Sequence, residues 1–278
     1  MTLLMSIFLG IVQGITEFFP ISSSGHLAVL QNMFNINEPD LLFEVLVHMG
    51  TLLAVCFSYR KDIYEMVRDG LEYLRLKSDS HKDEPITLKP PGRALLFIIL
   101  ATLPMFVAVF FYGAISRLFF NTFFIGFALL VTGGLLFVSS RYIKQGNKTE
   151  KTMTAVDAII IGLVQAVALL PGLSRSGTTI SVGLARGFSG SFAVRFSLLL
   201  SIPAILGSTF FEIFNLISEG ADFVLLPIYL VGFLFATIVG FFAIQFLRRI
   251  MAKGNLGYFA YYCWVVGVIV IIWSLFNI

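Results

Sequence analysis

The stretch EFFPISSSGH, residues 17–26, breaks an apolar segment that runs from Met1 to Phe34. A proline followed by serines and a glycine ends a helix. A second break, PGLSRSG at residues 171–177, interrupts the apolar segment from Ala155 to Ala185 in the same way. Non-helical backbone at membrane depth must be buried in protein or line a wet cavity. We therefore expect each segment to be a re-entrant helix pair that returns to its own side.

The composition places these breaks in a membrane protein. The 278 residues are 58% hydrophobic and 13% charged, with a mean hydropathy of +0.91, which excludes a soluble globular fold. A spanning helix needs about 20 mostly apolar residues. Six further segments meet this requirement: Leu41 to Tyr59, Ala94 to Gly113, Thr122 to Ser139, Phe192 to Ile217, Phe223 to Phe246 and Leu256 to Phe276. We expect one all-α integral membrane domain over residues 1–278, with six transmembrane helices plus two re-entrant pairs.

Charge and cysteine usage exclude several other classes. A formal net charge of +3 is too small to indicate nucleic-acid binding. The first basic residue is Arg60, so the apolar start has no signal-peptide charge pattern and is expected to belong to the mature fold. Cys56 and Cys263 lie in apolar runs and are expected to be packing residues, so neither a disulfide nor a metal site is indicated.

The two broken segments also resemble each other. Residues 9–14, LGIVQG, align with residues 161–166, IGLVQA, and the same offset places the first serine-glycine turn on the second. Each half then runs as a helix pair followed by three spans, residues 1–140 with a cytoplasmic loop at 60–93, and residues 155–278. Three is odd, so the halves form an inverted-topology repeat. Such repeats build sites from broken helices near the midplane.

Basic residues test this topology independently. The loops 60–93, 141–154 and 247–255 carry eight, four and three lysines and arginines, whereas loops 114–121 and 218–222 carry only Arg117. The positive-inside bias therefore places the first three loops in the cytoplasm. The termini and the first re-entrant loop then face outward. We expect the charge-rich stretch from Arg60 to Lys89 to be a solvated loop without a chemical role.

Few ionisable residues remain at membrane depth: Glu17, His26, Glu44, His48 and Arg175. Their burial is costly, so each is a candidate functional residue. Glu17 follows Gln13 on one helical face; it is either a wetted helix-end carboxylate or a group that binds a divalent cation or handles a proton. Glu44 and His48 are also four residues apart, and a supporting, a packing and a direct role all stay open.

The two turns hold the remaining candidates. Ser22, Ser23 and Ser24 could merely cap the following helix, or could join the helix-start amides in binding an anion and supply a nucleophile. His26 can act as an acid or base near neutral pH. Arg175 is either a structural partner of Glu17 or a fork for phosphate oxygens. If the repeats meet, Arg175 lies opposite Glu17 and Ser23.

Residues 13–26, QGITEFFPISSSGH, and residues 171–177 resemble the two signature motifs of undecaprenyl-diphosphate phosphatases of the bacitracin-resistance type. The resemblance covers essentially the whole chain. It implies hydrolysis of undecaprenyl diphosphate to the monophosphate and phosphate in the bacterial cell membrane, which recycles the lipid carrier for cell-wall synthesis. It also implies a divalent cation, Mg²⁺ or Ca²⁺. The family motif begins with glutamate or glutamine, and Gln13 here leaves Glu17 as its single carboxylate, which weakens a two-carboxylate metal site.

These expectations define a site. Catalytic roles fall to Glu17, Ser23, His26 and Arg175, and Glu17 is also the expected metal ligand. Substrate binding falls to Gln13, Ser22, Ser24, Gly25, Ser174, Ser176 and Gly177. We expect Arg175 and the helix-start amides to grip the diphosphate, and Ser23 to be the nucleophile with His26 assisting proton transfer. Attack by a histidine or by water stays open.

Two other classes of function compete. Inverted repeats with broken helices are common in transporters, so the chain could be a lipid-phosphate flippase or an anion carrier without hydrolysis. The serine-histidine turn beside a carboxylate is more chemistry than a carrier needs. A structural scaffold gives Glu17 and Arg175 no reason to be buried. The expected partner is a polyprenyl diphosphate lipid that reaches the site from the outer face, and a homodimer stays open.

Overall fold

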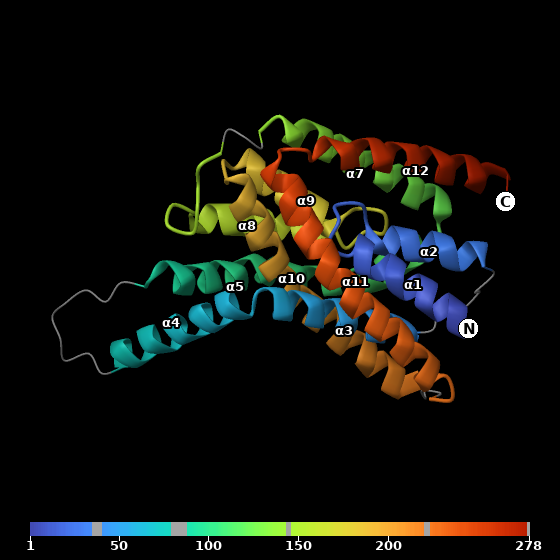
Figure 1. Cartoon of the computed structure of the whole chain (residues 1–278), viewed down its shortest axis with the longest axis horizontal. Helices are drawn as coiled ribbons and strands as arrows, with labels where there is room; N and C mark the ends of the chain where they lie inside the picture. The colour runs from blue at the N-terminus through green and yellow to red at the C-terminus, as the bar shows by residue number, and fades with distance from the viewer. Residues whose placement is uncertain (35–40, 79–87, 143–145, 220–222, 277–278) are drawn as a thin grey trace.

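The computed structural model describes residues 1–34, 41–78, 88–142, 146–219 and 223–276, and this part of the chain is built of helices (Figure 1). In chain order the helices are α1 (Leu3–Thr16), α2 (Ser23–Met33), α3 (Leu41–Ser58), α4 (Arg60–Ser78), α5 (Pro90–Val109), α6 (Tyr112–Leu118), α7 (Thr122–Ser140), α8 (Ala155–Val167), α9 (Arg175–Ala185), α10 (Gly190–Glu219), α11 (Leu226–Ala252) and α12 (Gly257–Phe276).

Six of these helices are long and apolar enough to cross a membrane: α3, α5, α7, α10, α11 and α12. Each overlaps one of the six segments that the sequence indicates, so the expected all-α membrane fold is confirmed. The ends differ by a few residues. Helix α11, for example, continues to Ala252 because Leu247 and Met251 keep the buried face of the helix apolar past the arginines at 248 and 249.

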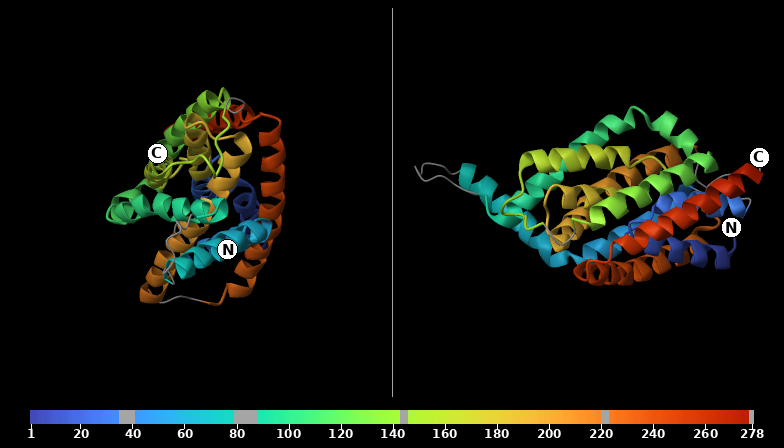
Figure 2. Two further views of the ribbon diagram at one scale, coloured as in Figure 1. Left: turned by 90° about the vertical axis from the view of Figure 1, so that its left-hand side faces the viewer. Right: turned by 90° about the horizontal axis from the view of Figure 1, so that it is seen from above.

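Helix α4 occupies Arg60–Ser78, where the sequence indicates a solvated loop, and residues 79–87 of that stretch lie outside the described part of the chain. It follows α3 directly after Tyr59 and runs beside α5 beyond the bundle (Figures 1 and 2). Apolar residues among its charges recur three and four positions apart, which is a helical period. Met66 is buried, so α4 has a packed face as well as solvated charges.

The two broken segments form the helix pairs α1–α2 and α8–α9. In Figure 1 the pairs reach inward from opposite ends of the molecule, and their turns meet near its centre. Helix α1 packs along α11, and α8 packs along α5. These contacts correspond under the repeat, because α8 takes the place of α1 and α5 the place of α11. Insertion of the pairs from opposite membrane faces stays a prediction.

Equivalent glycines let both pairs approach their neighbours closely. A Cβ at Gly10 of α1 would lie 2.4 Å from the carbonyl oxygen of Gly232 in α11. A Cβ at Gly162 of α8 would lie 2.4 Å from the carbonyl oxygen of Ala101 in α5. Small residues are the usual means of close helix packing in membranes. The two glycines occupy equivalent places in the sequence repeat, so both helix pairs pack closely on a neighbouring helix through the same kind of contact.

Candidate active site

The first turn joins α1 to α2 and carries a strained serine. Ser22 caps α2 by accepting a hydrogen bond from the Gly25 amide at 3.2 Å. Its backbone has φ +71°, a left-handed conformation that non-glycine residues rarely adopt. Such strain costs about 1–3 kcal/mol and persists only where the surroundings impose it. The turn is therefore held in place by its contacts rather than by local preference.

The second turn joins α8 to α9 and is held by α7. Ser174 caps α9 and accepts from the Gly177 amide at 3.0 Å. Thr132 of α7 donates its hydroxyl to the Gly172 carbonyl and accepts from the Ser174 amide, each at 3.1 Å. Gly172 has φ +88°, and a Cβ there would lie 2.5 Å from the Ile125 carbonyl oxygen. Only glycine adopts this φ readily and also leaves room for the Ile125 carbonyl, so the turn packs directly against α7.

The two turns touch each other through a repeated contact. A Cβ at Gly25 would lie 3.0 Å from the Gly172 Cα, and a Cβ at Gly177 would lie 3.2 Å from the Pro20 Cβ. The sequence offset that aligns the repeats exchanges these two pairs. The same contact is thus made twice, as at a two-fold interface. The Ser176 hydroxyl adds a cross-link by donating to the Phe19 carbonyl at 3.2 Å.

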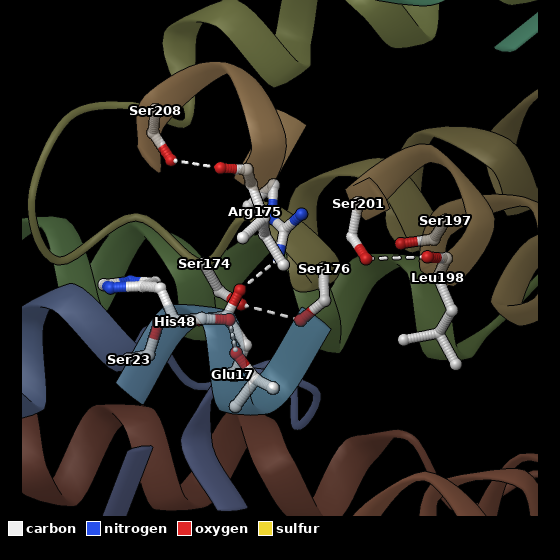
Figure 3. Close-up of polar contacts among 12 residues, drawn as sticks. Glu17, Ser23, His48, Ser174, Arg175, Ser176, Ser197, Leu198, Ser201 and Ser208 are labelled. Atoms are coloured by element: carbon white, nitrogen blue, oxygen red, sulfur yellow. Dashed lines mark hydrogen bonds and ion pairs between the residues drawn. The ribbon is translucent and has the colours of Figure 1, made fainter. Parts of the chain in front are cut away.

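Glu17 lies at the centre of the resulting site (Figure 3). One of its carboxylate oxygens forms an ion pair with Arg175 Nη2 across the two turns. The other oxygen accepts from the Ser23 hydroxyl at 2.7 Å and from Gln13 Nε2 at 3.1 Å. The Glu17 side chain is 5% exposed and that of Arg175 is 17% exposed. The structure therefore brings Gln13, Glu17, Ser23 and Arg175 into one connected group.

Two polar atoms of this group have no partner within the described residues. Arg175 Nη1 and Gln13 Oε1 are buried and make no hydrogen bond. Buried polar atoms in folded proteins are normally paired, so an unpaired donor and an unpaired acceptor in one connected group need an explanation. A ligand with anionic oxygens would satisfy Nη1, and a cation or a hydroxyl would satisfy Oε1. The site is thus equipped for a polar, negatively charged group.

The helix starts add to this attraction for anions. Helices α2 and α9 both begin at the junction, at Ser23 and Arg175. The first amides of a helix and its dipole favour negative charge at this end. Their caps, Ser22 and Ser174, also bring Ser24 and Ser176 within 3.4 and 3.3 Å of the cap hydroxyls. The residues expected to bind substrate are therefore all in the two turns or beside them: Gln13, Ser22, Ser24, Gly25, Ser174, Ser176 and Gly177.

The structure gives the His26 ring nitrogens two partners other than the Ser23 hydroxyl. Its Nδ1 lies 2.7 Å from the Ser22 carbonyl and therefore carries a proton, while Nε2 lies 2.8 Å from the Tyr262 hydroxyl. The imidazole also stacks on the Tyr262 ring, with the centroids 5.7 Å apart. Ser23 is instead hydrogen-bonded to Glu17. In this arrangement the hydrogen-bond partner of the Ser23 hydroxyl is the Glu17 carboxylate, and the role of His26 in proton transfer stays a prediction.

Glu44 and His48 lie beside the central group. Gln31 Nε2 donates to Glu44 Oε1 at 3.1 Å, and His48 Nδ1 lies 2.8 Å from the Glu44 carbonyl. The charge of Glu17 acts on His48, which comes from α3 (Figure 3). The sequence reasoning passed over Glu212 of α10, whose Oε2 is buried without a hydrogen bond and whose charge also acts on His48. The sequence signal that could have identified Glu212 is its position as an acidic residue inside the expected span Phe192 to Ile217.

The side chains of the site can supply only some of the ligands that a metal cation needs. Within the described residues no three His, Cys, Asp or Glu side chains are grouped as a metal site. Glu17 and the unpaired Gln13 Oε1 offer two oxygen donors. Mg²⁺ often binds one or two protein oxygens and completes its shell with water and substrate phosphates. The residues present therefore fit a cation that arrives with, or is shared by, a phosphorylated ligand.

The fold and the site together define a membrane protein with an anion-attracting polar site among six helices long and apolar enough to cross a membrane. The family model for bacitracin resistance protein BacA matches residues 6–269, and the chain belongs to this family.

Three relatives named as undecaprenyl-diphosphatases match this chain over nearly the full length of both proteins. The chain is 42% identical to an undecaprenyl-diphosphatase of Alkaliphilus metalliredigens, over 99% of this chain and 100% of that protein. It is 40% identical to an undecaprenyl-diphosphatase of Methanobrevibacter smithii, over 100% of both chains. It is 41% identical to undecaprenyl-diphosphatase 1 of Shouchella clausii, over 99% of this chain and 97% of that protein.

Proposed function

We propose that this chain is an undecaprenyl-diphosphatase. It hydrolyses undecaprenyl diphosphate to undecaprenyl phosphate and inorganic phosphate, and so recycles the lipid carrier for peptidoglycan synthesis. The family and the full-length relatives support this activity. The structural observation that carries it is the junction of the two turns, where Arg175, Glu17 and Ser23 form one connected group.

Arg175 binds the diphosphate in this proposal. Its Nη1 is unpaired and its Nη2 is held by Glu17, so the guanidinium is positioned before the substrate arrives. An arginine fork matches two phosphate oxygens at once. The starts of α2 and α9 add amide donors beside it. The polyprenyl tail stays among the apolar helices, so only the head group has to enter the site.

Glu17 and Ser23 then carry the chemistry. Glu17 already accepts the hydrogen bond of the Ser23 hydroxyl, so its carboxylate is placed to take the Ser23 proton. The serine oxygen attacks the terminal phosphorus, the bond to the bridging oxygen breaks, and undecaprenyl phosphate leaves. Water then cleaves the serine–phosphate bond and releases inorganic phosphate. In the variant pathway Glu17 and Ser23 orient a water for direct attack.

We further propose a divalent cation, Mg²⁺ or Ca²⁺, as cofactor. Glu17 and Gln13 Oε1 would hold it together with phosphate oxygens, which suits the shortage of carboxylates in the described site. When bound, it offsets the charge that develops on the transferred phosphoryl group. His26 has a positioning role in this scheme, because it links the strained Ser22 backbone to Tyr262 of α12.

The site is proposed to open to the outer face of the bacterial cell membrane. The fifteen basic residues in the loops 60–93, 141–154 and 247–255, against one in the opposite loops, support this orientation. The other function considered, a flippase or anion carrier without hydrolysis, is not favoured, because the full-length relatives are named as diphosphatases.

Phosphate release by the purified chain tests the proposal. The chain should release inorganic phosphate from undecaprenyl diphosphate in detergent, EDTA should stop the release, and Mg²⁺ or Ca²⁺ should restore it. A matched reaction with undecaprenyl phosphate should give little product, because the anhydride bond is absent. A folded preparation that releases no phosphate with either cation would contradict the proposed activity, and full turnover in EDTA would contradict only the cofactor.

A further inference from the structure

The carbonyl of Ser22, the strained cap residue of α2, is held twice by His26. The His26 amide donates to this carbonyl at 3.2 Å, and Nδ1 of the ring lies 2.7 Å from the same oxygen. A carbonyl oxygen can only accept a hydrogen bond, so Nδ1 carries a proton. His26 therefore fixes the peptide that joins Ser22 to Ser23. The Ser23 hydroxyl in turn donates to Glu17.

The second turn makes the same pair of contacts with a threonine. The repeat offset that places Ser22 on Ser174 places His26 on Thr178. The Thr178 amide donates to the Ser174 carbonyl at 2.8 Å, and the Thr178 hydroxyl donates to the same oxygen at 2.7 Å. A threonine is therefore sufficient to hold the cap carbonyl of such a turn. The histidine of the first turn adds a second ring nitrogen, Nε2, which this contact does not use.

The partner of His26 Nε2 is the hydroxyl of Tyr262 in α12, at 2.8 Å. The two rings also stack, with their centroids 5.7 Å apart and an angle of 10° between their planes. Because Nδ1 carries a proton, Nε2 of the neutral imidazole bears the lone pair and accepts from the hydroxyl. The same hydroxyl oxygen can accept from Nε2 when the ring is protonated. Tyr262 can thus pair with Nε2 in both protonation states of His26.

Helix α12 packs against the first turn on both sides of this contact. The Phe259 ring meets the Phe19 ring edge to face, with the centroids 5.2 Å apart. The Cys263 Sγ lies 3.8 Å from the Pro20 carbonyl oxygen. Residues three and four apart lie on one helical face, so Phe259, Tyr262 and Cys263 face the turn together. The Tyr262 hydroxyl is therefore placed by a packed contact between α12 and the turn.

We propose that Tyr262 is a positioning residue for the phosphatase reaction. Its hydroxyl holds the His26 ring so that Nδ1 donates to the Ser22 carbonyl and Nε2 is the nitrogen at which His26 takes up and releases a proton. Tyr262 acts through His26 and is not itself a catalytic residue. This inference rests on the proposed function, because it assigns a role at the same site.

Removal of the Tyr262 hydroxyl is the first test. Tyr262→Phe keeps the stacked ring and should lower kcat for phosphate release from undecaprenyl diphosphate by about tenfold, as for one lost hydrogen bond. The KM should stay nearly the same, because Tyr262 does not bind the substrate. Tyr261→Phe is the matched control and should keep the kcat of the parent chain, since the Tyr261 ring contacts Phe137 and Trp264. Full kcat in Tyr262→Phe, or an equal loss in Tyr261→Phe, would overturn the proposal.

A double-mutant cycle separates action through His26 from packing. His26→Thr keeps a hydroxyl for the Ser22 carbonyl, as Thr178 has for Ser174, and removes Nε2. It should keep a Tm near that of the parent chain while kcat falls by about 10²-fold or more. Adding Tyr262→Phe to His26→Thr should change kcat by less than about twofold, because the partner is already gone. Losses that multiply would show that the hydroxyl acts independently of His26 and would overturn the proposal.

Nitrogen-15 NMR of histidine-labelled protein reads the contact without turnover. At about pH 8, above the usual pKa of histidine, His26 should show a protonated Nδ1 and an unprotonated Nε2. The Nε2 resonance should shift in Tyr262→Phe and stay in place in Tyr261→Phe, and an unshifted resonance in Tyr262→Phe would overturn the proposal. A parent chain that releases no phosphate would contradict the proposed function, whereas the Nε2 resonance would still show whether Tyr262 holds His26.

Discussion

The two turns at the centre of the molecule have nearly the same backbone plan and very different chemistry. Ser22 and Ser174 cap α2 and α9 through equivalent amides, at 3.2 and 3.0 Å. The residue after the cap is Ser23 in the first turn and Arg175 in the second. The repeat offset places Leu169 opposite Glu17. The two turns thus share a capping geometry but differ in side chains, because the first carries a carboxylate and a hydroxyl and the second carries a cation.

The two turns also differ in how they are held. The second is fixed by the Thr132 hydroxyl and by the glycine conformation at Gly172. The first contains the strained Ser22 and is tied through His26 to Tyr262. The turn that carries Arg175 is thus anchored to α7, whereas the turn that carries Ser23 contains a strained residue. Four pairs of variants sharpen or break this comparison.

The largest loss of activity is expected from variants of Arg175, which pairs with Glu17 across the two turns. Arg175→Ala removes the only cation in the connected group and should lower phosphate release by roughly a thousandfold or more. Arg175→Lys should recover little, because a point charge cannot replace the bidentate fork. Phosphate release by purified protein measures both variants. Activity near that of the parent chain in Arg175→Ala would remove the second turn from the mechanism.

The next effect belongs to the first turn. Ser23→Ala removes the hydroxyl that donates to Glu17 and should reduce turnover by about 10²–10⁴-fold if the serine is the nucleophile. Ser24→Ala, next along the same turn, is the matched control and should cost far less. A Ser23→Ala variant that keeps a large share of its activity would instead favour direct attack by water.

A smaller effect separates two equivalent glutamines. Gln13→Ala removes a donor to Glu17 and the unpaired Oε1, so turnover should fall by about tenfold, as for one lost hydrogen bond to a charged group. Gln165→Ala, its counterpart in the second repeat, also removes an unpaired Oε1 but no contact with Glu17, since its Nε2 donates to the Met105 sulfur, and should leave turnover unchanged. Equal losses in both variants would show that the repeat, and not the site, requires the glutamine.

The smallest effect concerns the caps. Ser22→Gly loses a cap hydrogen bond but relieves the φ of +71°, whereas Ser174→Gly loses its cap at an ordinary φ of −78°. Replacing a serine cap with glycine lowers the free energy of unfolding by a few tenths of a kcal/mol, so Ser174→Gly should lower the Tm slightly. Ser22→Gly also relieves backbone strain, so it should leave the Tm unchanged or raise it. The Tm of purified protein in detergent measures both. A larger Tm loss in Ser22→Gly would contradict the assignment of strain.

Much of the fold could be predicted from the sequence because apolar length and broken segments are local signals. The six spans follow from hydropathy, and the breaks follow from Pro20 and from Pro171 with Gly172. Helix α4 was missed because its charges masked an amphipathic period. Its apolar positions, such as Tyr64 and Leu71, were visible in the sequence but were given too little weight.

The site was less accessible for a different reason. The meeting of Glu17 with Arg175 follows from the repeat, yet the partner of each side chain depends on contacts far apart in sequence. Tyr262 is 236 residues from His26, and no local pattern links them. Likewise, nothing in the sequence around Thr132 indicates that its hydroxyl forms hydrogen bonds with Gly172 and Ser174. The catalytic roles themselves stay predictions.

A disulfide between the turns tests the central claim most directly. In a Cys56→Ala/Cys263→Ala background, Pro20→Cys and Gly177→Cys place two thiols on carbons that lie 3.2 Å apart, close to the usual disulfide span. Oxidation in native membranes should join them in high yield, as read by mass spectrometry of the linked peptides. Two thiols that remain free and fully alkylated after oxidation would show that the turns do not meet.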